Sequence, residues 1–143
     1  MVLTKGDDFP LHQTPEPIAY AGTDRNFHDR YFFNGYAPDG SGFFAVAFGI
    51  YPHLNIADAH FSTIRDGVQY NLHASRELGM ERMDLQVGPI RIEIVEPLHK
   101  VRYVCERNKI QPIAYDVTFT SEMIPFFENR HRQRERDGFR VGS

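Results

Sequence analysis

The chain has 143 residues, of which 41% are hydrophobic and 24% are charged, which is typical of a single soluble globular domain. The formal net charge of −3 argues against a nucleic-acid binder that depends on a general basic surface, and no apolar run is long enough to cross a bilayer. The one cysteine, Cys105, excludes an internal disulfide framework and any zinc site that needs several thiolates. Residues 1–8 lack the apolar stretch of a secretory signal, so we expect a cytoplasmic protein.

The chain divides into three parts by composition. Residues 1–27 contain Pro10, Pro15 and Pro17, and because proline fixes φ and lacks an amide donor, we expect an extended strap there. Residues 28–127 alternate short β patterns with turn signals and are expected to form the β domain. Residues 128–143 hold five arginines and three acidic residues, which indicates a charged tail or the start of a linker.

The first predicted hairpin joins residues 31–38 to residues 41–50. Asp39-Gly40 favours a two-residue type I′ turn, in which both central residues have positive φ. That turn fixes the register, which pairs Tyr31 with Phe48, Phe33 with Val46 and Tyr36 with Phe43.

The second predicted hairpin turns at Asp66-Gly67 and separates an apolar face from a polar one. The apolar face pairs Ala59 with Ala74, Phe61 with Leu72 and Thr63 with Tyr70. The polar face pairs Asp58 with Ser75, His60 with His73, Ser62 with Asn71 and Ile64 with Gln69. Because side chains alternate between the two faces of a strand, we expect the apolar face to join a core. The polar face then meets solvent or a polar pocket.

The third predicted hairpin joins residues 90–95 to residues 100–106, and a further strand covers residues 113–120. The hairpin register sets Ile92 against Tyr103 on one face and the ion pair of Glu93 and Arg102 on the other. A tight turn at residues 108–109 would put the apolar residues of the last strand on the wrong face, so we expect a β-bulge near Pro112. The predicted fold is an all-β antiparallel meander of seven or eight strands.

The sharpest candidate for chemistry is the group of Asp58, His60 and His73. Directly opposed side chains on paired strands have Cβ atoms about 4.5–5.5 Å apart, so the two imidazoles are expected to touch. Two histidines with a carboxylate suit general acid–base catalysis, and we expect them to be the catalytic residues. The alternatives are a solvated polar face and a metal site; since a third histidine is missing, we expect no metal and no organic cofactor.

Further residues are candidates for ligand binding. Arg30 lies in a charged stretch that enters a strand and can clamp a carboxylate or form a structural ion pair. An aromatic stripe either lines an apolar cavity or simply forms the core. The expected ligand-binding residues are Tyr31, Phe33, Asn34, Phe48, Phe61, Tyr70, Asn71 and Arg30. Cys105 lies on an apolar face and is expected to be a small buried side chain.

Several stretches carry a resemblance to a known family. They are residues 7–13 (DDFPLHQ), 29–36 (DRYFFNGY), 65–69 (RDGVQ), 72–76 (LHASR) and 87–93 (VGPIRIE). With them the chain resembles uncharacterised bacterial proteins grouped with the carotenoid 1,2-hydratase (hydroxyneurosporene synthase) superfamily. That resemblance implies a lipocalin-like (calycin-like) barrel or a strongly curved sandwich.

The resemblance also implies a function and a partner. It implies that the chain is the amino-terminal half of a two-domain protein that binds a hydrophobic, lipid- or isoprenoid-like molecule, within an enzyme of the hydratase or isomerase type. The alternatives are a non-catalytic lipid carrier and a structural module that docks a second β domain. The expected partners are therefore a hydrophobic small molecule and a second β domain or a homodimer partner, with no nucleic acid and no integral membrane segment.

Overall fold

The computed structural model describes residues 3–11, 17–126, 131–135 and 138–142, and its regular structure is almost entirely antiparallel β-sheet. Two sheets have four strands each, and in both the strands follow one another in chain order. The first sheet contains β1 (Asp29–Tyr36), β2 (Gly42–Tyr51), β3 (Ile56–Arg65) and β4 (Val68–Glu77). The second contains β5 (Gln86–Val87), β6 (Ile90–Glu96), β7 (Lys100–Cys105) and β8 (Tyr115–Thr120). The predicted all-β antiparallel meander is confirmed.

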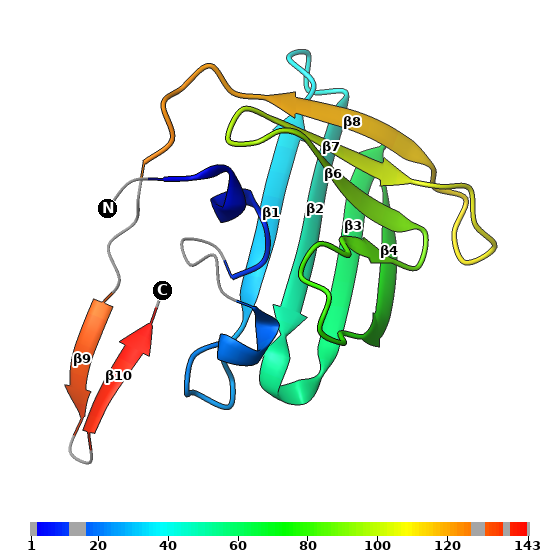
Figure 1. Cartoon of the computed structure of the whole chain (residues 1–143). Helices are drawn as coiled ribbons and strands as arrows, with labels where there is room; N and C mark the ends of the chain where they lie inside the picture. Colours follow the sequence, from blue (N-terminus) through cyan, green and yellow to red (C-terminus); the bar gives the residue numbers. More distant parts are fainter. Residues whose placement is uncertain (1–2, 12–16, 127–130, 136–137, 143) are drawn as a thin grey trace.

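The two sheets lie one over the other, and their strands cross at a steep angle (Figure 1). Strands β1–β8 form two separate hydrogen-bonded sheets and do not close into a barrel. This arrangement is a β-sandwich, in which the inward side chains of both sheets fill the space between them. Between the layers, the rings of Phe33 and Tyr103 lie 4.7 Å apart and those of Phe61 and Tyr115 lie 3.7 Å apart.

The hairpin registers agree with the sequence prediction, but one turn differs in type. Tyr31 pairs with Phe48, and His60 pairs with His73. Asp66 and Gly67 have φ values of 52° and 75°, as a type I′ turn requires. The predicted type I′ turn at Asp39-Gly40 is wrong, because only Gly40 has a positive φ there.

The first hairpin instead closes through the five residues 37–41, which contain the four-residue β-turn 37–40. The amide of Gly40 donates to the carbonyl of Ala37, and the amide of Ala37 donates to the carbonyl of Gly42. Pro38 occupies the second position of this turn, where its fixed φ is favoured, and Gly40 takes the left-handed conformation that follows it. The register survives because the loop still leaves Tyr36 opposite Phe43.

The connection between β7 and β8 is a loop rather than the predicted bulge near Pro112. Strand pairing runs without a shift from Cys105 opposite Tyr115 to Lys100 opposite Thr120. The side chain of Asn108 organises the loop, since its Nδ2 donates to the carbonyls of Glu106 and Ile113. The longer loop has the effect that was expected of the bulge, because it places the apolar residues of β8 on the inner face.

Where the structure describes the amino-terminal strap, at residues 3–11 and 17–27, it is irregular apart from two single 3₁₀ turns, Lys5–Asp8 and Ile18–Tyr20. It contributes Leu11 and Ile18 to the buried core. The guanidinium of Arg82 donates to backbone carbonyls of the strap, among them those of Gly6, Phe9 and Pro10. One arginine side chain therefore ties this segment to the loop between the sheets.

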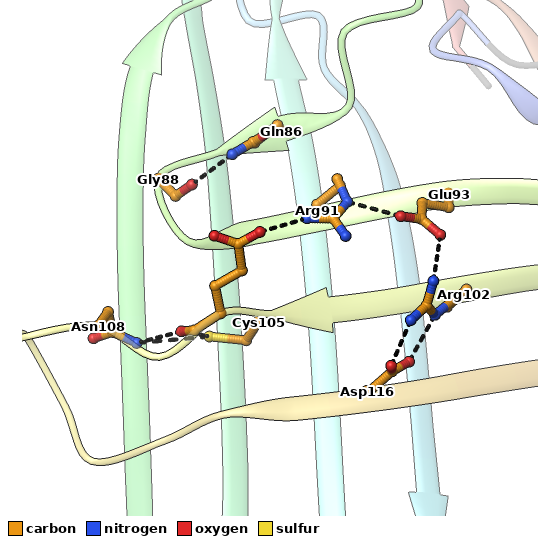
Figure 2. Close-up of polar contacts among 9 residues, drawn as sticks. Gln86, Gly88, Arg91, Glu93, Arg102, Cys105, Asn108 and Asp116 are labelled. Atoms are coloured by element: carbon orange, nitrogen blue, oxygen red, sulfur yellow. Dashed lines mark hydrogen bonds and ion pairs between the residues drawn. The ribbon is translucent and has the colours of Figure 1, made fainter.

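A ladder of opposite charges crosses the outer face of the second sheet (Figure 2). Arg91 contacts Glu93 and Glu106 at 2.8 and 2.9 Å, and Arg102 contacts Glu93 at 3.0 Å. Arg102 also forms two hydrogen bonds to Asp116, which completes the ladder across three strands. The predicted cross-strand pair of Glu93 and Arg102 is confirmed.

Two further strands occupy the region expected to be a charged tail. β9 (His131–Glu135) and β10 (Gly138–Gly142) pair with each other as a separate antiparallel hairpin. In β9, arginine occupies every second position, which is the side-chain period of a strand. The prediction of a tail rested on the high charge of the segment and did not take this alternation into account. Within the described residues, no helix has the length and apolar character needed to span a membrane.

Candidate functional site

The outer face of the first sheet carries the predicted polar residues in straight rows across the four strands. The observed registers align Arg30, Gly49, Asp58 and Ser75 in one row. The next row contains Phe32, Ala47, His60 and His73, and the third contains Asn34, Ala45, Ser62 and Asn71. These side chains point away from the second sheet, because their neighbours along each strand fill the core.

A groove of about 650 Å³ runs over this face. Its floor follows β2, where the outward positions hold the small residues Ala45, Ala47 and Gly49 between the larger Phe43 and Tyr51. One wall comes from Arg30 and Phe32 of β1, and the other from Asp58, His60, His73 and Ser75 of β3 and β4. The groove thus forms because the outward side chains of β2 are small, while those of β1 on one side and of β3 and β4 on the other are larger.

The two histidines belong to a continuous chain of hydrogen bonds. Nδ1 of His60 lies 3.1 Å from Nδ1 of His73, and Nε2 of His60 lies 2.6 Å from the hydroxyl of Ser62. The Ser62 hydroxyl donates to Oδ1 of Asn71 at 2.6 Å, and Gln69 donates to the same oxygen at 3.0 Å. The chain therefore begins at the exposed His73 and ends in side-chain amides at the far end of β4.

The direction of these hydrogen bonds follows from a count of protons. Ser62 has one hydroxyl proton and gives it to Asn71, so it accepts a hydrogen bond from Nε2–H of His60. Neutral His60 then has a lone pair on Nδ1, which accepts the Nδ1–H of His73. Nε2 of His73 retains its lone pair and has no hydrogen-bond partner among the described residues. This nitrogen therefore carries a free lone pair at the wall of the groove.

The surroundings of His60 disfavour its charged form. The pKa of His60 lies below its ordinary value because of burial first and the nearby charge of His73 second, while Asp58 opposes the shift. His60 is therefore the neutral imidazole in the hydrogen-bond chain.

Gly49 makes room for a second polar group at the opposite end of the groove. A Cβ at this position would lie 2.9 Å from Oδ1 of Asp58 and 3.5 Å from the hydroxyl of Tyr51. The pKa of Tyr51 is raised by burial and by the negative charge of Asp58, whereas Arg30 acts in the opposite direction. Glycine is needed here because two side chains approach its backbone closely.

The structure places the predicted residues in two separate regions. Arg30, Asp58, His60 and His73 line the groove. Asn34 and Asn71 lie on the same face in the next row. The predicted aromatic residues Tyr31, Phe33, Phe48, Phe61 and Tyr70 lie on the opposite, inner face, where they belong to the core or pack against it.

Several residues of the groove were missed from the sequence. Phe32 and Tyr51 line it, and the small residues of β2 form its floor. The available signal was the run of small residues at alternate positions 45, 47 and 49. Among the described residues, no group of three or more histidine, cysteine, aspartate or glutamate side chains is placed to hold a metal ion.

Fold and site together define an all-β protein of the sandwich class, with a polar groove on the outside of one sheet. A family of unknown function, DUF8625, matches residues 3–141, and the chain belongs to this family. No curated protein and no solved structure matches the chain.

Proposed function

We propose that the protein binds a small molecule with an apolar body in the groove over β2, and that His73 exchanges a proton with it. The observation that carries this proposal is Nε2 of His73, which lies in the wall of a groove of about 650 Å³ and has no hydrogen-bond partner in the described part of the chain. This volume lies in the range of small-molecule sites, and the alanine floor favours an apolar ligand.

The hydrogen-bond chain supports proton transfer by His73. His60 fixes the orientation of the His73 ring, and Ser62 and Asn71 fix the tautomer of His60. A base held in one orientation suits general acid–base chemistry of the hydratase or isomerase type. The relation to the carotenoid 1,2-hydratase superfamily, with its lipocalin-like fold, is part of this proposal, as is a non-catalytic carrier role for the same groove.

A second candidate is docking of another protein domain or of a second copy of the chain. Exposed apolar side chains beside the groove favour it, since Phe32, Tyr36 and Ile64 are 58%, 74% and 42% exposed on the same face. Large exposed aromatic side chains on one face mark interaction surfaces. A docking surface does not require the small-residue floor of the groove, whereas ligand binding in the groove does. A substitution that fills this floor therefore distinguishes the two candidates.

The uncharged fluorescent probe N-phenyl-1-naphthylamine tests the binding proposal. We expect saturable binding to the wild-type chain and at least tenfold weaker binding to Ala47→Leu, because the leucine side chain fills the floor of the groove. Thr118→Leu, an equally apolar change on the outer face of the second sheet, is the matched control and should bind like the wild type. Equal binding by Ala47→Leu and the wild type would place the probe elsewhere and overturn the proposal.

A further inference from the structure

One arginine in the groove differs from the other strand arginines of the two four-stranded sheets. Arg65, Arg76, Arg91 and Arg102 each contact a carboxylate within 4 Å. Arg30 has no carboxylate at that distance among the described residues. Its side chain is exposed and lines the groove.

Arg30 lies at one end of the groove, so the groove has a charged end and an apolar floor. Arg30 lies in the row of Gly49, and the small-residue floor extends from there to Ala45. Four residue steps of about 3.4 Å each make this floor about 14 Å long. A charged end and an apolar floor together match a ligand that has a charged head and an apolar tail.

The charge of the head follows from the chemistry of arginine. A guanidinium is always protonated and presents a planar fork of donors that matches an oxyanion. Asp58 lies across Gly49 in the same row, but Tyr51 lies beside this carboxylate and its pKa responds to it. The carboxylate of Asp58 thus lies on the Tyr51 side of Gly49. Arg30 lies on the other side, two strands away from Asp58 in the same row, and is the cation that this end of the groove offers to a ligand.

We infer that the ligand is an amphiphile with an oxyanion head, a carboxylate or a phosphate, bound by Arg30 with its tail along Ala47 and Ala45. This inference rests on the proposed function and names the ligand class of the same groove.

Displacement of bound N-phenyl-1-naphthylamine measures the affinities of three ligands, which are decanoate, decyl phosphate and decanol. We expect one or both anions to bind about tenfold more tightly than decanol, as a charge-assisted hydrogen bond provides. The tighter of the two anions identifies the head group. Arg30→Gln should remove this preference, so that the anions bind no more tightly than decanol to the same variant. Arg65→Gln removes the same charge from an exposed site on β3 and should keep the preference.

The outcomes separate the inference from the proposed function. If decanol binds as tightly as both anions, or if Arg30→Gln and Arg65→Gln weaken the anions equally, the oxyanion inference is wrong. The groove proposal stands in both cases, provided that Ala47→Leu still weakens the uncharged probe. If the probe does not bind to the wild-type chain at all, the groove proposal itself fails.

Discussion

Three tyrosines in the core differ in what their hydroxyl groups contact. The hydroxyl of Tyr31 donates to the backbone carbonyl of Asp8. The buried hydroxyls of Tyr103 and Tyr115 have no partner among the described residues. Burial raises the pKa of both phenols, so they stay neutral. A buried hydroxyl without a partner costs about 1–3 kcal/mol of stability, whereas a satisfied one contributes about 1 kcal/mol.

The same chemical change should therefore have opposite effects at two positions. Tyr31→Phe should lower the free energy of unfolding by about 1 kcal/mol, because the Asp8 carbonyl loses its donor. Tyr103→Phe should leave it unchanged or raise it by about 1 kcal/mol, because no protein partner is lost. Urea unfolding of both variants measures the difference. A larger loss for Tyr103→Phe than for Tyr31→Phe would show that the Tyr103 hydroxyl is satisfied.

The histidine pair makes a prediction about individual nitrogens. At pH 8, nitrogen NMR should find the proton of His60 on Nε2 and that of His73 on Nδ1, as the hydrogen-bond chain requires. The opposite assignment at either ring would break the chain at Ser62 or between the rings.

The pKa of His60 should respond to its two charged neighbours in opposite directions. His73→Gln should raise this pKa toward the ordinary value of about 6.5, because a nearby positive charge is removed. Asp58→Asn should lower it further, because the one favourable charge is lost. Proton NMR titration of the His60 ring measures both shifts. Shifts of the same sign in the two variants would contradict this account of the site's electrostatics.

At the scale of elements, the amino-terminal strap is held by contacts with residues that are distant in the sequence. Arg82 donates to the carbonyls of Gly6 and Phe9, more than 70 positions earlier in the chain. The strap is too short and too proline-rich to form a sheet of its own. It is held in place by Arg82, by the contacts of Asp8 and by burial of Leu11.

Arg82→Lys should loosen the strap, because a single ammonium cannot span carbonyls that a guanidinium fork contacts together. We expect a loss of about 2 kcal/mol in the free energy of unfolding. Faster hydrogen exchange is expected at the amides of Asp7 and Phe9, which bond within the strap. Arg107→Lys, at an exposed loop position, is the matched control. Unchanged exchange in Arg82→Lys would mean that other contacts hold the strap.

The elements themselves were predictable where local rules act strongly. Asp66-Gly67 and the alternation from Asp58 to Ser75 fixed the second hairpin and brought His60 opposite His73, as observed. The first hairpin shows the limit, because Pro38 changed the turn type without changing the register. The loop held by Asn108 and the strap held by Arg82 depend on contacts that no short sequence pattern encodes.

For the whole molecule, the hardest feature to predict was which side of the first sheet holds the site. The sequence showed an aromatic face and a polar face, and both were candidates for ligand binding. The structure shows that the aromatic face is the core, because Phe33 and Phe61 pack against Tyr103 and Tyr115 of the second sheet. The groove arises from the absence of bulk at Ala47 and Gly49 between larger neighbours. It is a property of four strands in register, so no single strand reveals it.

Amide NMR mapping with decanoate tests the central claim, which is that the outer groove is the binding site. We predict that the largest shift changes fall on residues 45–51 of β2 and on the facing part of β3 around His60, with little change at Tyr103 on β7. Perturbations centred on β7 and β8 would place the ligand between the sheets and contradict the account. An absence of perturbation at saturating decanoate would contradict it as well.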